Sequence, residues 1–530
     1  MVRGLAAVLV ALGCASESVT TVPITADGGD VAPAPAEMSP TALAVRLSID
    51  LRGVRPTPEE LLPLEGLNTL EAADAALQTL VDDFLRDPRF PKRVRDLWAP
   101  VFRTRVEDFP VPSTALGLTP EEQPALYASI GEEPLQVVAR VADEDLPWTE
   151  LVTGNWTMVD DTLAAHWPVE REGSGGWTPA QYTDRPAAGL LSVNGLWWRY
   201  LSDGVSYGRG RANAVARIFL CADFLDRPVD FPRELDLTDE AAIKAAVREN
   251  TGCVGCHSAL DPLAGYLAGL QYADLTGPEL IAYHPERERE WGVTTESHPA
   301  FYGEAGYSLA DLGRQLAADP RYVQCAVERS FEMLTRRKPD LWALTRHREA
   351  FLAGGLTLRS LLRSIVRDPA YRDATAERLI TPEIWGDQLE AWTGYRLVSA
   401  GADLLGTDRT GLRSLAGGGD GRAGSNSSEV PTTTMALVWQ RTAEAAAAYA
   451  AANPEESGLF EVDPSVPGEP ESLGAQLRAW HLRLHGRPMA EDGVAATSAL
   501  WDTLAAMDGP RAAWAGVLTA LLRDPELLVY

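Results

Sequence analysis

The residues best suited to chemistry lie in the segment Cys253-Val254-Gly255-Cys256-His257. A Cys-x-x-Cys-His segment is the attachment sequence for c-type haem. Its spacing lets two thiols add across the two vinyl groups of the macrocycle, while the adjacent histidine reaches the iron. We therefore expect one covalent haem c, with thioethers at Cys253 and Cys256 and His257 as the proximal iron ligand.

Two other chemistries also use a Cys-x-x-Cys pair. A zinc site requires about four nitrogen or sulfur ligands, but the sequence has no second Cys-x-x-Cys, and the next histidines, His284 and His298, lie in a polar stretch. A redox-active thiol pair of the thioredoxin type requires a strand–loop–helix context, whereas the residues before the motif have a helical pattern. Haem attachment is therefore the preferred interpretation. The second axial ligand stays open between Met333, His284 and His298.

The N-terminal residues 1–14 have the order of an export signal: Arg3, an apolar stretch, then Gly13-Cys14. A cysteine after a small residue at this place resembles the lipobox of bacterial lipoproteins, which implies lipidation of Cys14. The alternative is an ordinary cleaved signal in which Cys14 has no role. Residues 15–40 are rich in Ser, Thr, Pro, Ala and Gly, so we expect a flexible tether. The expected location is the cell envelope, in the periplasm or on the outer surface.

The remaining cysteines are expected to pair. An exported chain meets oxidising conditions, where thiols without a role are rare. Of the five cysteines, only Cys221 and Cys325 are left after Cys14 and the two motif cysteines. We expect them to form a disulfide. The alternative is two separate buried thiols, because cysteine also packs as a small apolar residue.

The composition limits the partners of the protein. Among 530 residues, 75 are Asp or Glu and 47 are Lys or Arg, which gives a formal net charge of −28. Such a charge disfavours binding to nucleic-acid phosphates or to anionic lipid. A redox partner is expected to present a basic patch and to dock transiently. No apolar run reaches the ~18–20 residues that span a bilayer, so contact with the membrane is expected only through the N-terminal lipid.

Apolar residues recur at helical spacing almost throughout, and alternating patterns typical of strands are scarce. The expected fold is mainly α: several helical modules with a haem-c segment in the middle, long loops and little or no sheet. One pattern recurs, in which an apolar helix and a basic residue before proline are followed by more helix. It stops at Arg86-Asp87-Pro88, Arg367-Asp368-Pro369 and Arg523-Asp524-Pro525. We interpret the recurrence as related helical modules that pack on one another.

These patterns divide the chain into seven expected segments. They are a lipoprotein signal (1–14), a tether (15–40), an N-terminal helical module (41–130), a Trp-rich central domain (131–245), a haem-motif and closing helical domain (246–375), a linker with a Gly/Ser-rich loop (376–435) and a C-terminal helical module (436–530).

Tryptophans are concentrated between residues 148 and 198, which hold six of the fifteen. Exposed indoles could stack on sugar rings, and a carboxylate pair could cleave glycosides; the candidates are Asp160, Asp161, Glu170 and Glu172. The preferred interpretation is a core filled by large aromatic side chains.

One further pair of histidines has the spacing of metal ligands. His481 and His485 are four residues apart, which places them on one face of a helix. No acidic third ligand stands out in the nearby sequence, and the flanking Trp480, Leu482 and Leu484 favour a half-buried helix instead.

Several segments resemble the domains of planctomycete-type multidomain proteins associated with c-type cytochromes. The resemblance rests on LSIDLRGVRPTPEEL, LVDDFLRDPRFPKRVRDLW, LPWTELVTGNWTMVDDTLAAHW, RPAAGLLSVNGLWWRYLSDGVSYGRGRANAVARIFLC, ENTGCVGCHSALDPLAGYLAGLQ and DPRYVQCAVERSFEMLTRR. It covers most of residues 42–372 and includes the cysteines at positions 221 and 325. In that family the haem motif is followed by Asp-Pro, here Asp261-Pro262, which we expect to shape the turn after the attachment helix. The family has no established reaction.

The sequence therefore predicts an exported, lipid-anchored c-type haem protein that acts in electron transfer, and it leaves open whether the protein is an enzyme. Two alternatives remain. One is an extracellular polysaccharide-binding or -degrading protein with an accessory haem. The other is a structural surface lipoprotein without haem, in which the two motif cysteines form a local disulfide.

Overall fold

The computed structural model describes residues 36–106, 108–109, 113–201, 208–228, 236, 238–270, 279, 281–399, 401–407, 410–420, 426–466 and 469–530. It is 61% helix and 5% strand, with 23 α-helices and three small sheets in the described ranges. The mainly helical fold class predicted from the sequence is confirmed. Cys14, the expected signal and most of the expected tether lie outside the described residues.

The larger of two hydrophobic cores is built by the elements between residues 40 and 371. The helices in this part of the chain are α1 (Pro40–Arg52), α2 (Pro58–Leu61), α3 (Leu70–Phe84), α4 (Phe90–Phe102), α5 (Gln123–Asp143), α6 (Glu150–Thr153), α7 (Asp161–His166), α8 (Asn194–Arg199), α9 (Arg209–Leu220), α10 (Glu240–Glu249), α11 (Thr251–Gly265), α12 (Pro285–Thr295), α13 (Leu309–Ala318), α14 (Pro320–Thr335), α15 (Leu341–Ala353) and α16 (Leu358–Ile365). All of them except α10 contribute buried side chains to the first core. None of the helices in the described part of the chain is long and apolar enough to cross a membrane.

The sheets are short and antiparallel. In the largest, β3 (Thr178–Tyr182) lies between β1 (Thr157–Val159) and β2 (Val169–Arg171). Thr157 is opposite Ala180, and Val169 is opposite Tyr182. The two remaining sheets are the pairs β4 (Ala300–Phe301) with β5 (Glu304–Ala305) and β6 (Val398–Ser399) with β7 (Ala402–Asp403).

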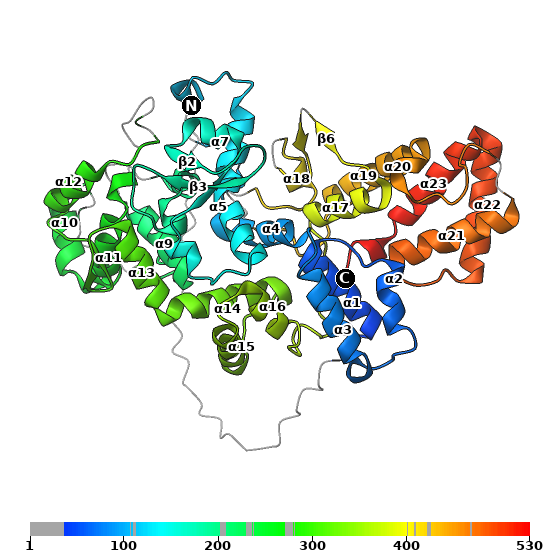
Figure 1. Ribbon diagram of the computed structural model, residues 1–530, viewed down its shortest axis with the longest axis horizontal. Coiled ribbons are helices and arrows are strands. Elements are labelled where there is room, and N and C mark those ends of the chain that lie inside the picture. The colour runs from blue at the N-terminus through cyan, green and yellow to red at the C-terminus, as the bar shows by residue number, and fades with distance from the viewer. Residues whose placement is uncertain are drawn as a thin grey trace, which may run out of the picture.

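The second core is formed mainly by the C-terminal helices. They are α17 (Pro382–Thr393), α18 (Leu412–Leu415), α19 (Thr433–Ala452), α20 (Pro454–Ser457), α21 (Pro470–His485), α22 (Glu491–Asp508) and α23 (Pro510–Leu522). Helices α21, α22 and α23 lie at the opposite end of the molecule from α10, α11 and α12 (Figure 1). The long helix α19 presents small buried alanines to α23, which allows the two helix backbones to approach closely.

The segment 376–435, expected to be a linker, instead contributes a buried helix. Thr381 caps α17 at its N-terminus, Pro382 occupies the first turn, and Gly394 ends the helix with a left-handed φ of 72°. Trp385 and Trp392 of this helix are buried in the second core. The Gly- and Ser-rich composition further along the segment concealed this short, well-capped helix.

Helix α1 belongs to both cores, and nearly all of its residues are buried. Leu47 and Leu51 pack into the first core, whereas Val45 and Ile49 pack into the second. A helix that is apolar on several faces is typical of a position inside the protein. The C-terminus of the chain lies beside α1 (Figure 1), so the two ends of the described chain meet between the cores.

A buried ionic network holds this junction together. Asp50 of α1 forms an ion pair with Arg378, and their side chains are only 1% and 2% exposed. The hydroxyls of Tyr371 and Tyr530 each donate a hydrogen bond to the Asp50 carboxylate at 2.9 Å. Main-chain hydrogen bonds between Arg378 and Tyr530, at 2.9 and 3.0 Å, fix the last residue beside the network. One carboxylate thus connects α1, the segment between the cores and the C-terminus.

The recurring sequence pattern has a recurring local structure. The first helix of each repeat ends in a left-handed residue, with φ values of 80° at Gly53, 57° at Arg336 and 70° at Gly486. At each Arg-Asp-Pro stop, the aspartate accepts a hydrogen bond from the main-chain N–H two residues later. These distances are 2.8 Å at Asp87, 2.8 Å at Asp368 and 2.9 Å at Asp524. The aspartates therefore form Asx turns that end the helical modules.

The Asp50 network predicts a large effect of a small change. We expect Asp50→Asn to lower the free energy of unfolding by about 3–5 kcal/mol, because the Arg378 guanidinium would be left buried without its counter-charge. Urea unfolding at neutral pH measures this difference, with Asp502→Asn on the exposed face of α22 as the control. A loss no larger than that of the control would contradict the role given to the ion pair.

Candidate functional site

The three motif residues share one face of helix α11. Asn250 caps the helix, and its side chain accepts hydrogen bonds from the N–H groups of Gly252 and Cys253 at 2.9 and 3.4 Å. Cys253, Cys256 and His257 follow at spacings of three and four residues, which are neighbours on a helix surface. Both cysteines are free thiols and are partly exposed. A flat ligand that approaches this face would therefore meet two thiols and one imidazole.

A carboxylate orients the motif histidine. Nδ1 of His257 lies 3.0 Å from an oxygen of Asp261, one helical turn further along α11. Arg209 of α9 donates two hydrogen bonds to the same carboxylate, at 2.6 and 3.0 Å. Burial by itself would raise the pKa of Asp261, but the hydrogen bonds from His257 and Arg209 outweigh it, so the pKa lies below its ordinary value. An ionised Asp261 then holds the Nδ1–H tautomer, which leaves Nε2 as the nitrogen that can bind a metal.

Asp261-Pro262 does not form the expected turn. Helix α11 continues through Pro262 and ends at Gly265. The proline removes one main-chain hydrogen bond inside the helix. Two features compensate for this loss: Leu260 and Leu263 are buried against the core, and Arg209 forms an ion pair with Asp261, which is called the clamp on Asp261 below. The Asp-Pro pair therefore serves to position His257 rather than to end the helix.

The two ends of α11 differ in how closely they are packed. At the buried end, a Cβ atom on Gly265 would lie 2.6 Å from the ring of Trp291 in α12, so only glycine fits. At the motif end, a Cβ on Gly255, between the two cysteines, would meet nothing within 4 Å. The helix also packs against α9, α10 and β4. It is thus fixed at one end and open to solvent beside the thiols.

The three candidates for a second axial ligand have different surroundings. Met333 lies in α14 and packs against the first core, as an ordinary core methionine does. Both ring nitrogens of His284 have partners: Nδ1 lies 3.0 Å from Glu286, and Nε2 lies 2.8 Å from the carbonyl of Glu279. His298 is exposed and lies two residues before β4, the strand that packs against α11.

Cys221 and Cys325, the pair set apart by the cysteine count, are joined in the structure with an S–S distance of 2.10 Å. Cys221 follows the last residue of α9, and Cys325 lies in α14. The bridge spans 104 residues of sequence. It fixes the helix that carries Arg209, and so supports the clamp on Asp261.

The tryptophan-rich region is used mostly for packing. Its buried tryptophans, all at most 4% exposed, are Trp148, Trp167, Trp197 and Trp198. Trp156 and Trp177 are partly buried against the same core, and Trp156 also packs under the guanidinium of Arg140. The indoles therefore fill the first core, where Trp148 packs on Trp98 of α4 and Trp167 on Trp198 of α8.

The carboxylates proposed for glycoside cleavage have local partners. Asp160 caps α7 through the N–H of Leu163 at 2.8 Å, and Asp161 pairs with Arg171 at 2.5 Å. Glu170 and Glu172 are exposed, at or just after β2.

The sequence analysis missed Glu133, a fully buried carboxyl group in the tryptophan-rich region. It accepts four hydrogen bonds, from Thr157, Trp167, Tyr182 and the N–H of Gly195, at 2.8 to 3.1 Å. Burial raises the pKa of Glu133 despite these bonds. Its hydrogen bonds fix the positions of the aromatic side chains Trp167 and Tyr182. Its position within α5 gives no signal in the sequence, because its four partners come from residues 24 to 62 positions away.

A Ser-His-Asp group also lies outside the predicted site. Nδ1 of His347 lies 2.8 Å from the hydroxyl of Ser364, and Nε2 lies 2.9 Å from Asp368. Ser364 is in the last turn of α16, where the helix dipole disfavours a developing oxyanion. Asp368 is also engaged by Arg346 and by its Asx turn. The group is best explained as a buried connection between α15 and α16.

Comparison with known proteins places one part of the chain in a family. Residues 38–169 match the family described as PSD4, protein of unknown function (DUF1592). The chain therefore carries a DUF1592 domain that runs from the start of α1 to the start of β2. No curated protein and no solved structure matches the chain. The motif helix α11 lies outside the matched residues.

The clamp on Asp261 predicts a pH-dependent contribution to stability. Because the pKa of Asp261 is lowered in the folded state, its carboxylate stabilises the protein above about pH 4, the ordinary carboxyl range, and loses this effect as the pH falls through the lower folded value. We expect Asp261→Asn to be less stable than the wild type at neutral pH, and the difference to shrink in acid. Urea unfolding across this range measures it. A difference that stays constant into acid would contradict the assignment.

Proposed function

We propose that α11 attaches one c-type haem and that the protein transfers electrons at the cell envelope. The observation that carries the proposal is the arrangement of Cys253, Cys256 and His257 on one partly exposed helix face, with Asp261 holding the histidine. Neither zinc binding nor thiol redox chemistry requires an oriented histidine directly after the second cysteine. Haem attachment requires both thiols and this histidine.

The residues present fit a haem. Both thiols are free and accessible, and the surface beside Gly255 is open. The hydrogen bond from Nδ1 of His257 to Asp261 is the kind of second interaction that fixes the tautomer of a metal-binding imidazole and raises its basicity. Cys253 and Cys256 would hold the group covalently, and His257 would bind its iron through Nε2. When bound, the haem supplies one reversible electron per cycle.

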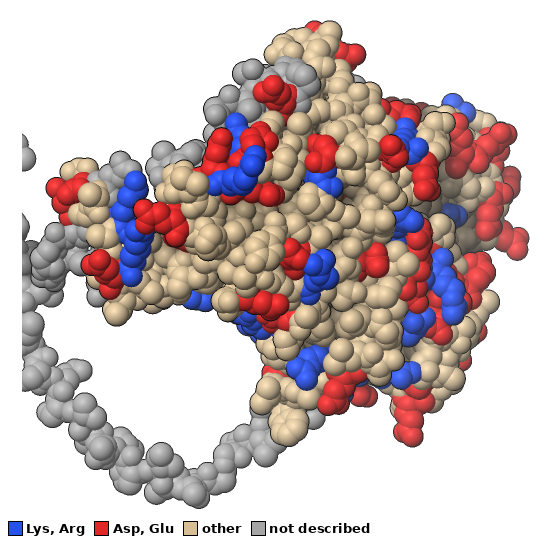
Figure 2. All heavy atoms as spheres, turned by 60° about the vertical axis from the view of Figure 1, so that its left-hand side comes forward, with Lys and Arg blue, Asp and Glu red and all other residues tan. Residues whose placement is uncertain are grey.

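The protein contributes orientation and charge. Arg209 and Asp261 limit the rotation of the His257 ring, and the disulfide between Cys221 and Cys325 restrains the helix that carries Arg209. On the face drawn in Figure 2, acidic side chains are spread widely, with basic side chains among them. Together with the net charge of −28, this favours a redox partner with a basic patch, for which docking is fast and sensitive to salt.

The test is expression of the full chain in a host that matures c-type cytochromes. We expect a pyridine haemochrome spectrum of the c type and an intact mass that includes one haem, because two thioethers hold the group covalently. Cys253→Ala with Cys256→Ala should remove both signals, whereas Ser258→Ala, on the exposed side of the same helix, should keep them. Among ligand variants, we expect His298→Ala to change the Soret and near-infrared bands and Met333→Leu to leave them unchanged.

One result of this experiment would contradict the electron-transfer proposal. If the host matures other c-type proteins and this chain carries no haem, the electron-transfer proposal is wrong. A mass lower by two hydrogens than that of the free dithiol would then identify a disulfide between Cys253 and Cys256, as expected for a structural surface protein.

The proposed location at the cell envelope rests on Cys14 and requires its own test. We expect the chain to incorporate a labelled fatty acid in a bacterial host and to partition with the membrane fraction, because an acyl chain favours the bilayer. Cys14→Ala should abolish both results, and Ser16→Ala should retain them. Labelling that persists in Cys14→Ala would exclude lipidation at this cysteine.

A further inference from the structure

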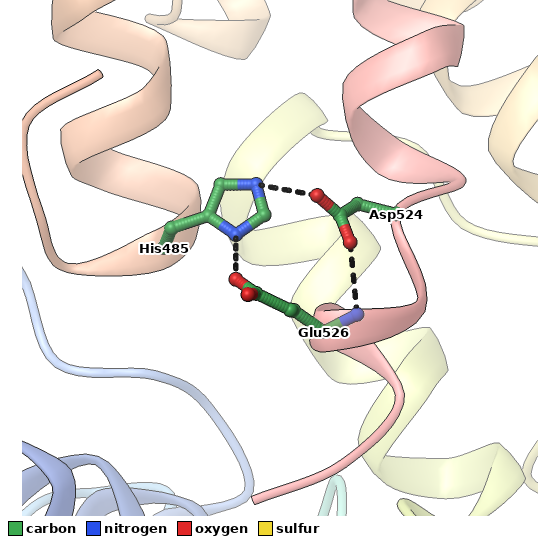
Figure 3. Close-up of side chains that lie close together, drawn as sticks. All are labelled: His485, Asp524 and Glu526. Atoms are coloured by element: carbon green, nitrogen blue, oxygen red, sulfur yellow. Dashed lines mark hydrogen bonds and ion pairs between the residues drawn. The ribbon is translucent and has the colours of Figure 1, made fainter. Parts of the chain in front are cut away.

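A second group of candidate ligands lies in the other core, at the end of α21. His485 is the last residue of that helix, and Asp524 and Glu526 flank the start of the 3-10 helix η6 (Pro525–Leu527). One ligand atom of each residue lies within 4.8 Å of the other two. Figure 3 shows the two carboxylates on either side of the imidazole, each facing one ring nitrogen. The cluster joins segments about 40 residues apart in the sequence.

The imidazole of His485 is buried without a hydrogen-bond partner. Its side chain is 2% exposed, and Nε2 has no partner among the described residues. Nε2 lies 3.9 Å from Asp524, and Nδ1 lies 3.6 Å from Glu526. Both distances are too long for hydrogen bonds. Donor atoms bound about 2.0–2.1 Å from one tetrahedral ion are roughly 3.4 Å apart, and one ligand atom from each of the three residues lies within 4.8 Å of the others. Because the two carboxylates face different ring nitrogens, the exposed Glu526 side chain has to turn toward Nε2 to share an ion with Asp524.

Comparison with the first repeat shows a missing positive charge. There, Arg52 is the last residue of α1 and forms ion pairs with two carboxylates, Glu60 and Asp87. In the third repeat the corresponding last residue of α21 is His485, and Asp524 takes the position of Asp87. The position that holds a guanidinium in the first repeat thus holds a buried imidazole nitrogen in the third.

We propose that His485, Asp524 and Glu526 form a binding site for a divalent transition-metal ion, with zinc as the best match. One imidazole nitrogen and two carboxylate oxygens are a donor set that Zn²⁺ accepts, whereas Ca²⁺ and Mg²⁺ favour oxygen donors alone. The ion replaces the positive charge that Arg52 supplies in the first repeat. It connects the end of α21 to η6. This 3-10 helix ends three residues before Tyr530, whose hydroxyl donates a hydrogen bond to Asp50.

Two arginines, Arg487 and Arg55, lie next to the proposed metal site. Arg487 pairs with Glu526 at 2.5 Å, but both side chains are more than half exposed. Such a surface pair is weak and can open. Arg55 donates to the carbonyls of Glu526 and Val529, at 2.9 and 3.2 Å, and not to the carboxylates. Neither arginine therefore satisfies the buried imidazole, and within the described part of the chain Asp524 forms no ion pair with a cation other than His485.

His481 lies one turn before His485 and is held away from the cluster. Its ring stacks on that of His485 with 4.4 Å between centroids, and its Nδ1 lies 2.8 Å from the carbonyl of Arg487. It acts as a neighbour that supports the orientation of His485, and the three ligand residues above are sufficient for the site.

The test is zinc binding to the full chain, measured by isothermal titration and by metal analysis after dialysis. A parallel series carries Cys253→Ala and Cys256→Ala, so that zinc bound by free motif thiols is counted separately and the outcome is independent of haem attachment. We expect one zinc per chain in this series and a rise in melting temperature that a chelator reverses. Cobalt should give visible bands without thiolate charge-transfer bands, because the proposed site has no sulfur.

Two ligand variants and one control decide the assignment. We expect His485→Asn and Glu526→Gln to weaken zinc binding at least ~100-fold, since loss of a supporting second-sphere group alone costs about 10–100-fold. Glu526 is exposed, so its variant keeps the fold if the buried His485 variant does not. Glu471→Gln, at the exposed start of α21, should bind as the parent does. Absence of binding in the parent, or unchanged binding in Glu526→Gln, would overturn the proposal.

Discussion

The structure depends on the buried carboxylate of Asp50. It accepts hydrogen bonds from two tyrosines and pairs with Arg378, and these partners come from the end of the first core and from the last residue of the chain. A buried charge is costly unless it is paired and hydrogen-bonded. The partners of Asp50 are therefore complete only when both cores are packed around α1. This constraint explains why a helix at residue 40 is in contact with a residue at position 530.

The candidate site also depends on a carboxylate that several partners hold in place. Asp261 accepts from His257 within its own helix and from Arg209 of α9, and this fixes a side chain that would otherwise rotate freely on a partly exposed surface. The motif face stays open, while Trp291 and the core close the other end of α11. A site for covalent attachment needs both features, since the thiols must be reachable and the iron ligand must be oriented.

The repeated Arg-Asp-Pro stops show how one local motif acquires different partners. Each aspartate forms the same Asx turn, but Asp87 meets Arg52, Asp368 meets His347 and Arg346, and Asp524 faces His485. The turn depends only on residues adjacent in sequence, so it recurs wherever the pattern does. The side chain that approaches each carboxylate comes from a different helix, and it determines whether the turn carries an ordinary ion pair or a cluster with an unsatisfied imidazole.

The sequence by itself determined what depends on neighbouring residues: the helical fold class, the module-ending turns, and the placement of Cys253, Cys256 and His257 on one helix face. These follow from periodicity, capping residues and a five-residue spacing. Only the tertiary structure decided which distant groups complete each site. Arg209 reaches Asp261 across 52 residues, and Asp524 reaches His485 across 39 residues. The fully buried Glu133 was hidden for the same reason, because its role depends on side chains brought together by packing, and local sequence patterns carry no record of such partners.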